Sequence, residues 1–232
     1  MIKATYIDHM GSDLSVVNAA RVSFGKKSDW ELTPVDHSEG VSWKGYPNKP
    51  YKKLKKSDKR LIEYLAKHKH ISPFGHAFAS FHVKAPVFVA RQLVKHSYLR
   101  WNEVSRRYVS EDPEFYTPTL RESSMDKKQG SGGALSISHQ QDEVIRQAHI
   151  QALKQYQYLL KTGVCEEQAR GILPLNHMTE WYWSGSLDAF ARMCNLRCKP
   201  DTQEETRKVA DQINEKMSEL FPVSWEALLE NE

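Results

Sequence analysis

The chain of 232 residues has a formal net charge of +4, with 40% hydrophobic and 27% charged residues. These proportions are those of a globular protein, and the length is sufficient for a sizeable core. No apolar run approaches the ~20 residues that cross a bilayer, and the N-terminus lacks the apolar centre of a secretory signal. We therefore expect a cytoplasmic protein with no membrane partner. The mild positive charge is suited to anionic small molecules and does not require a nucleic-acid partner.

Apolar periodicity predicts a succession of strands and helices along the chain. We expect strands or extended segments over 2–8, 77–85 and 176–183, and helices over 13–21, 52–66, 139–161 and 166–173. Further helices are expected after Pro86, which suits a first helical turn, and after Ser186 and Thr202, which can act as N-caps. Residues 225–228 are expected to form a short terminal turn. Neither a repeat nor a clear linker divides the chain, so we expect a single domain over residues 1–232.

Two segments have the composition of surface loops. Residues 24–56 contain three prolines, and Trp30 and Trp43 are candidate aromatic anchors within them. Residues 122–138 include the run QGSGG, and a glycine-rich loop can surround a phosphate. This run lacks the Lys-Ser/Thr ending of a P-loop, so a flexible loop is the favoured interpretation.

The three cysteines are Cys165, Cys194 and Cys198. An odd number without a secretory signal argues against a disulfide framework. Cys194 and Cys198 are one helical turn apart, but no further His or Cys stands nearby to complete a zinc site. None of the three lies in a nucleophile motif. We therefore expect no metal at this pair.

Four histidines, His68, His70, His76 and His82, fall within fifteen residues. A metal site is one interpretation of this cluster. Against it, no carboxylate lies among the four histidines, and Ser72-Pro73 interrupts the helix that would have to present them.

Residues 91–108 read RQLVKHSYLRWNEVSRRY. An apolar helical pattern ends within them at Val94, and the residues after it are mostly polar or aromatic. The five cations of this stretch are interleaved with Gln, His, Asn and Ser, as in a site that orients an anion. Arg170 and Arg197, on separate apolar helix faces, could add to such a site. The alternatives are a solvated basic surface for the stretch and ordinary ion pairs for the two arginines.

Residues 95–107 resemble the signature R-H-R-x-x-S-x-N-x-x-S-x-R of the flavin-dependent thymidylate synthases. The match holds at His96, Asn102, Ser105 and Arg107, and it departs at Lys95, Ser97 and Arg100. The flanking block HISPFGHAFASFHVKAPVFVARQ and the later block ARGILPLNHMTEWYWSGSL also resemble the family. The resemblance covers most of the chain and is weakest over residues 24–55.

The resemblance implies an α/β (α+β) fold with a mixed sheet and packed helices, in a homotetramer whose active sites are shared between chains. It implies reductive methylation of dUMP to dTMP without a cysteine nucleophile. FAD would carry electrons from NADPH, and methylenetetrahydrofolate would supply the carbon.

Site residues follow from the resemblance position by position. The implied dUMP-binding residues are Gln92, Glu103, Ser105, Arg106, Arg107, Arg170 and Arg197. The implied FAD-binding residues are His70, Ser72, Lys95, His96, Ser97, Asn102, Glu103, Ser186 and Arg192. Arg197 would be catalytic by polarising the uracil, and no metal is implied. Ser97 lacks the guanidinium that the family directs at the flavin diphosphate, and Arg100 is the nearby candidate to replace it.

Two other functions stay open at this point. One is a related flavin- and folate-dependent enzyme that modifies a pyrimidine nucleotide differently, for example by hydroxymethylation. The other is a non-enzymatic nucleic-acid-binding protein that uses the basic stretch, which would show steeply salt-dependent binding.

Overall fold

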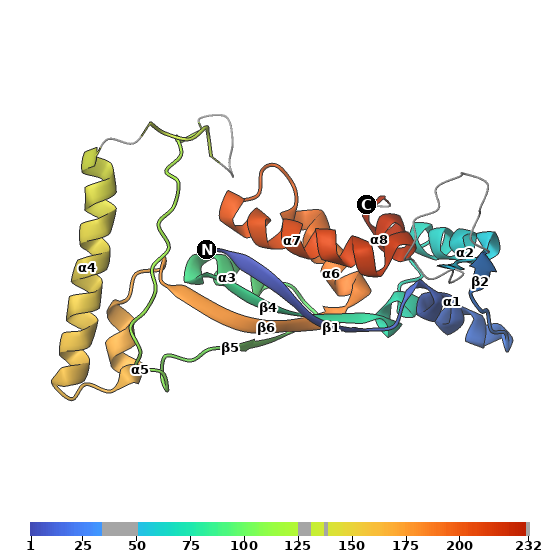
Figure 1. The fold of residues 1–232 in the computed structure, drawn as a ribbon, viewed down its shortest axis with the longest axis horizontal. Coiled ribbons are helices and arrows are strands. Elements are labelled where there is room, and N and C mark those ends of the chain that lie inside the picture. Colours follow the sequence, from blue (N-terminus) through green and yellow to red (C-terminus); the bar gives the residue numbers. More distant parts are fainter. Residues whose placement is uncertain (34–50, 125–130, 137–138, 231–232) are drawn as a thin grey trace, which may run out of the picture.

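The computed structural model describes residues 1–33, 51–124, 131–136 and 139–230 (Figure 1). One sheet has the strand order β1 (Lys3–Met10), β4 (Phe78–Pro86), β6 (Met178–Ser186) and β5 (Leu99–Glu103). A separate antiparallel pair consists of β2 (Glu31–Thr33) and β3 (Tyr51–Lys53). The helices are α1 (Asp13–Arg21), α2 (Lys56–Lys67), α3 (Val87–Leu93), α4 (His139–Lys161), α5 (Glu166–Ala169), α6 (Leu187–Arg197), α7 (Glu204–Leu220) and α8 (Pro222–Glu230). Short 3₁₀ turns are η1 (Val22–Phe24), η2 (Ser72–His76) and η3 (Arg170–Ile172).

All strand pairs of the described sheet are antiparallel, so the expected mixed sheet is wrong. The reason lies in the strand order. Strands β4 and β5 both run antiparallel to β6, and β6 lies between them. The β4–α3–β5 unit is therefore a split βαβ unit whose two parallel strands are never neighbours.

Helices cover one face of this sheet, as the alternation along β4 predicts. Phe81 and Val83 are fully buried, whereas the intervening His82 is partly exposed. Figure 1 shows α6 and α7 above the sheet. Phe190 of α6 makes edge contacts with Phe81 and with Trp183 of β6, at ring-centroid distances of 5.4 and 5.5 Å. Edge-to-face packing of this kind contributes beyond the area it buries.

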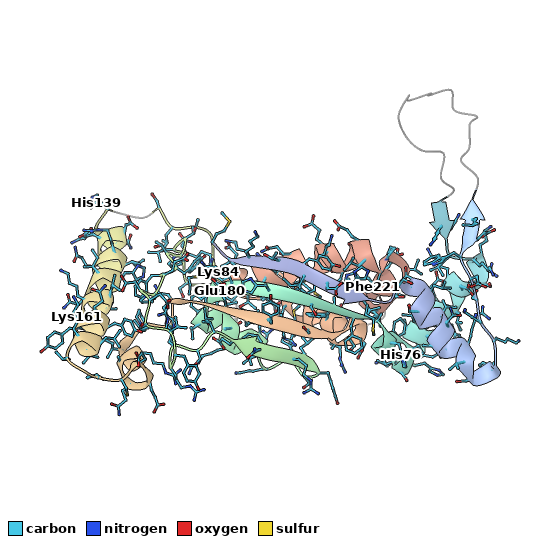
Figure 2. The ribbon with its side chains drawn as sticks, turned by 60° about the horizontal axis from the view of Figure 1, so that its bottom comes forward. His76, Lys84, His139, Lys161, Glu180 and Phe221 are labelled. Carbon is cyan, nitrogen blue, oxygen red and sulfur yellow. The ribbon has the colours of Figure 1, made fainter. Side chains whose placement is uncertain are left out.

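No helix of the described chain covers the opposite face. Phe78 and Tyr182 remain 40% and 53% exposed there. Lys84 and Glu180 lie side by side on the sheet (Figure 2), with Nζ 3.5 Å from a carboxylate oxygen. Lys84 also pairs with Glu114 at 2.5 Å, and this hydrogen bond raises the pKa of Lys84.

Helix α4 stands apart from the sheet, with His139 and Lys161 at its two ends (Figures 1 and 2). Its last turns pack against α5 and η3 through the small cluster Tyr156, Ala169 and Leu173. Outside this cluster, Val144 and Tyr158 are 66% and 67% exposed. The helix is thus fixed to its own chain over only part of its length.

The chain differs from the sequence-based expectations at several element boundaries. Residues 24–56 contain β2 and β3 in addition to loop, and Trp30 packs against the core as expected, while Trp43 lies outside the described residues. The N-cap of α7 is Gln203, because the Thr202 hydroxyl donates to the carbonyl of Leu196 instead. The expected turn at 225–228 belongs to the longer helix α8. No helix in the described part of the chain is long and apolar enough to cross a membrane.

Candidate active site

Arg197, the last residue of α6, is held by the turn that follows α3. Its Nε donates to Nε2 of His96 at 3.0 Å, and an Nη donates to the carbonyl of Gln92 at 3.4 Å. Burial lowers the pKa of Arg197. Within the described ranges no carboxylate pairs with this guanidinium, so the ion-pair alternative finds no partner there. A half-buried cation without an anionic partner is suited to receive an anionic or carbonyl ligand.

His96 fixes the direction of that cation. Burial, followed by the charge of Arg197, lowers the pKa of His96 to about 4. The imidazole is therefore neutral at physiological pH, and its Nε2 lone pair accepts the hydrogen bond from Arg197. The remaining proton belongs to Nδ1. A neutral acceptor orients the guanidinium without cancelling its charge.

Gln92 connects this pair to the start of α7. Its Nε2 donates to Oε1 of Gln203 at 2.6 Å, and its Oε1 accepts from the hydroxyl of Thr206 at 3.1 Å. Both ends of the Gln92 amide are thus engaged within the protein. The resemblance implies a contact of Gln92 with dUMP, whereas here its side chain is directed to α7.

A group of residues implied to bind FAD gathers at one end of the sheet. Ser186 of β6 is opposite Phe78, where β4 begins directly after η2, and Gly185 is opposite Leu99 at the start of β5. A Cβ on Gly185 would lie 2.4 Å from Leu99, so glycine permits the close approach of these two strands. This end of the sheet therefore brings η2, β5 and the start of α6 together.

Ser186 and Arg192 both bind Asp188 at this end. The Ser186 hydroxyl donates to Oδ1 at 2.6 Å and an Arg192 Nη to Oδ2 at 3.0 Å. The Arg192 guanidinium also lies over the ring of Tyr98, 5.1 Å from its centroid. Tyr98 has the left-handed φ of 65°, which costs energy for a residue with a Cβ. The i,i+4 spacing of Asp188 and Arg192 could have predicted their pairing from sequence, but the place of Tyr98 could not.

The exposed donors here have the chemistry of a diphosphate site. His70, Ser72, Lys95 and Ser97 are all exposed, and no salt bridge engages Lys95 in the described ranges. A lysine with hydroxyl and imidazole donors fits the phosphates of FAD. Arg100 stands on the uncovered face of β5, because Leu99 before it and Trp101 after it point to the core side. It is thus turned to the face opposite α6.

Several residues implied to bind dUMP lie at or after the other end of β5, together with Glu103, which is implied to bind FAD as well, whereas Gln92 and Arg197 lie with His96. Glu103 accepts from the Thr179 hydroxyl at 2.6 Å and from Nε1 of Trp101 at 3.1 Å. Arg106 donates to the carbonyl of Glu111 at 2.8 Å. This fixes the chain that leaves β5 beside the start of β6.

The remaining cations of this group make only local contacts. Nε of Arg107 donates to the hydroxyl of Ser105 at 3.3 Å, and the Arg107 guanidinium lies 4.9 Å from the centre of the Tyr108 ring. Arg170 is exposed and donates to the carbonyl of Glu167. No hydrogen bond or ion pair of the described residues joins this group to the Arg197–His96 pair.

Asn102 and Arg100 face away from Glu103, since side chains alternate along a strand. The sequence presented these residues as one stretch, and the strand distributes them over two faces. From Leu99 to Glu103 the strand also covers roughly 13 Å, at about 3.3 Å per residue. Glu103 and the residues that follow it are thus separated from the implied ligands near Leu99.

The histidine cluster disperses in the structure. His82 pairs with Glu180 at 3.0 Å on the uncovered sheet face, while His68 and His70 pack around Tyr64. Among the described residues, no three His, Cys, Asp or Glu side chains gather as a metal-ligand set. Cys165 is exposed, Cys194 is buried with a raised pKa caused by that burial, and Cys198 is partly exposed.

Comparison with known proteins places these features in a family. Residues 5–223 match the family described as thymidylate synthase complementing protein. The flavin-dependent thymidylate synthase of Thermus thermophilus is 38% identical over 226 residues, which cover 97% of this chain and 74% of that protein. The enzyme of the same name from Thermotoga neapolitana is 36% identical over 223 residues, covering 96% of this chain and 88% of that protein.

A solved structure has the same fold. The UMP/dUMP methylase PolB from Streptomyces cacaoi, bound with 5-Br UMP, superposes with a TM-score of 0.80 at 29% identity. The match covers 100% of this chain and 95% of that one. With a family match over nearly the whole length and relatives above 30% identity, this chain belongs to the flavin-dependent thymidylate synthases, a family of methyltransferases.

Proposed function

We propose that this protein methylates C5 of dUMP to form dTMP, with FAD as the flavin, NADPH as the reductant and methylenetetrahydrofolate as the carbon donor. The relatives are named for the flavin and the product, and the similar solved structure is named as a dUMP methylase. The observation that carries the proposal is the Arg197–His96 pair, a cation oriented by a neutral acceptor and free of any described carboxylate.

Arg197 is proposed as the catalytic residue. Loss of the N3 proton gives a uracil anion whose negative charge lies on the carbonyl and N3 edge and makes C5 more nucleophilic, and a fixed guanidinium stabilises that charge. The stabilisation is larger in the transition state than in the ground state, which is the condition for a gain in rate. His96 holds the guanidinium in one direction, so no reorientation is required during the reaction.

FAD is proposed to lie at the sheet end formed by η2, β5 and α6, where His70, Ser72, Lys95 and Ser97 offer their donors. When bound, FAD would supply the electrons that convert the transferred carbon into a methyl group. At this end the carboxylate of Asp188 already accepts hydrogen bonds from Arg192 and Ser186. Both side chains are therefore partly committed before a cofactor arrives.

The reaction is proposed to proceed without a cysteine nucleophile. Nucleophilic catalysis by cysteine requires a thiolate within reach of the ring. Cys194 is 1% exposed and its raised pKa disfavours the thiolate, and among the described residues no hydrogen bond joins Cys165 or Cys198 to a base or cation.

We further propose that the active site is shared between chains of a homotetramer, each chain folding as one domain. Glu103 and the residues after it are roughly 13 Å along β5 from the proposed flavin end. Reacting groups must approach to about 3–3.5 Å, and a second chain that brings its own Glu103 end to the flavin end of the first would shorten this separation. The uncovered sheet face and the exposed apolar residues of α4 are surfaces that a second copy would bury.

A second candidate substrate is UMP, because the similar solved structure is named as a methylase of both nucleotides. The test is incubation of the flavin-loaded protein with methylenetetrahydrofolate, NADPH and either dUMP or UMP, followed by mass spectrometry of the nucleotide. A methylated product of dUMP supports the proposal, and a hydroxymethylated product would overturn it. Methylation of UMP alone would assign the second candidate.

A further inference from the structure

A buried ion pair, outside the proposed set of ligands, is connected to the Arg197–His96 pair through two glutamines. Arg121 contacts Glu205 with two nitrogens, at 2.9 and 2.8 Å, and contacts Glu204 at 2.9 Å. Its Nε donates to the hydroxyl of Ser131 at 2.6 Å. This bidentate pair attaches the segment at Arg121 to the first turn of α7.

The Glu205 carboxylate is more deeply buried than that of Glu204, the other acid that contacts Arg121. Glu205 is 1% exposed. Burial alone would raise its pKa, yet hydrogen bonds from Arg121, its own backbone and Gln203 leave the pKa of Glu205 below its ordinary value. A carboxylate that stays charged in such a place depends on the donors around it. Loss of the Arg121 charge should therefore disturb this carboxylate more than loss of the neutral Gln203 amide, which is one donor among several.

A continuous chain of hydrogen bonds leads from this carboxylate to Arg197. Gln203 donates to Glu205 at 3.1 Å and accepts from Gln92 at 2.6 Å. The carbonyl of the same Gln92 accepts from Arg197, which in turn donates to His96. Each step joins neighbouring side chains or the backbone of the turn that carries His96.

We infer that Arg121, Glu205 and Gln203 are positioning residues, which fix Gln92 and through it the Arg197–His96 pair. Gln203 is the single described side chain that contacts both Glu205 and Gln92. Its role is to transmit the orientation set by the ion pair to the turn after α3. The catalytic meaning of this inference rests on the proposed function, whereas its test does not require activity.

The test measures the titration of His96 by NMR in protein labelled with ¹⁵N at histidine. Two variants interrupt the chain at different links: Glu205→Gln removes the charge that holds Arg121, and Gln203→Leu leaves that ion pair in place but breaks the link to Gln92. In each variant we expect the pKa of His96 to rise from about 4 by at least about one pH unit, because Arg197 leaves its position and the turn becomes more open. Affinity for dUMP should fall about tenfold, since one charge-assisted contact is misplaced.

The double variant Glu205→Gln/Gln203→Leu distinguishes transmission from general destabilisation. If both residues act through one chain, the double variant shifts His96 no further than either single one. Arg146→Ala is the matched control, because it removes an Arg–Glu pair from the exposed surface of α4 and should leave His96 unchanged.

An unchanged His96 titration in both folded single variants would overturn the inference, even with a lowered melting temperature. The inference would also be overturned if the double variant shifted the pKa of His96 by the sum of the two single shifts. Should Glu205→Gln fail to fold, Gln203→Leu alone decides, since it retains the buried ion pair. Failure to methylate dUMP in the parent protein would remove the proposed function but leave this result standing.

Discussion

Arg197 illustrates how a side chain acquires its chemistry from two neighbours. Its Nε is committed to His96 and an Nη contacts the carbonyl of Gln92, and no carboxylate of the described residues pairs with the guanidinium. We expect Arg197→Ala to slow methylene transfer to dUMP by on the order of 10²-fold or more, the scale of one lost preorganised donor. Arg197→Lys should lose nearly as much, because an ammonium has no fork that bonds His96 and substrate together.

Stopped-flow measurement of the two half-reactions checks this expectation. Flavin reduction by NADPH should change less than carbon transfer, since no uracil anion forms in that step. If folded Arg197→Ala protein transfers the carbon at the parent rate, Arg197 has only a structural role.

His96 makes the stability of the protein depend on pH. Burial and the charge of Arg197 hold its pKa at about 4, against an ordinary value of 6.5. Between these values the unfolded chain binds more protons than the folded one, so the free energy of unfolding rises with pH and is lost as pH falls through this window. With partial exposure taken into account, we expect a loss of about 1–3 kcal/mol from this residue.

Urea unfolding at about pH 7 and about pH 4 isolates this contribution when the parent is compared with His96→Asn. The asparagine oxygen can still accept from Arg197, but it does not titrate. The variant should therefore lose less stability on acidification than the parent. Equal losses in both proteins would mean that His96 is protonated as easily when folded as when unfolded.

The cysteines provide a prediction of no effect. With Cys194 buried and no hydrogen bond of the described residues joining Cys165 or Cys198 to a base or cation, replacement of all three by alanine should leave turnover of dUMP within about tenfold of the parent, roughly 1.4 kcal/mol in barrier. A folded triple variant that has lost turnover would instead indicate a thiolate mechanism.

Among the elements, α8 owes its start to a residue more than two hundred positions earlier. The carboxylate of Asp13, the first residue of α1, accepts from the backbone N–H groups of Val223 and Ser224 at 3.1 and 2.9 Å. Asp13 is 3% exposed. A buried anion at a helix N-terminus caps the helix and interacts favourably with the positive end of its dipole. Asp13→Ala should therefore lower the free energy of unfolding by about 2 kcal/mol. Denaturant unfolding measures this cost, with the exposed Asp201→Ala as the control; a cost as small as that of the control contradicts the capping role.

The elements with one clear pattern were predictable from sequence. The alternation of apolar and polar residues around Phe81 predicted β4. The apolar periodicity that begins at His139 and ends before Gly163 predicted α4, and the bounds of that helix are confirmed. Strand β5 was not predicted, because its five residues are few and lie inside the polar stretch 91–108. It forms by pairing with β6, a contact far along the sequence that no local pattern contains.

The same limit applies to the site. Family resemblance named Arg197 and His96 separately, but only folding joins α6 to the turn after α3. Gln203 carried no sequence signal at all, since its importance comes from bonding Gln92 across 111 positions. Local periodicity therefore predicts elements, whereas contacts between their ends decide which side chains meet.

At the scale of the whole molecule, the chain has surfaces that its own residues leave open. Helices lie over one sheet face, while the other exposes Phe78 and Tyr182 beside the charged pair Lys84–Glu180. Helix α4 projects from the body with Val144 and Tyr158 about two-thirds exposed. Exposed apolar residues of this kind favour association, and in the proposed homotetramer they would lie between chains.

A shared active site predicts complementation between two inactive variants. Arg197→Ala removes the proposed catalytic cation from one group, and Arg107→Ala removes a proposed phosphate ligand from the group at the other end of β5. If each site combines the first group of one chain with the second group of another, random assembly at equal amounts gives mixed oligomers in which about a quarter of the sites carry both arginines. Coexpressed chains with two different affinity tags, purified on both, should therefore regain turnover well above either variant alone.

The control for this experiment is the double variant Arg197→Ala/Arg107→Ala coexpressed with the parent chain. In a shared site this mixture also contains about a quarter of intact sites, whereas in a site within one chain half of them are intact. The two arrangements thus differ in both mixtures and in opposite directions. Turnover of the coexpressed single variants that does not exceed their separate values, together with about half of parent turnover in the control, would show that one chain holds the entire site.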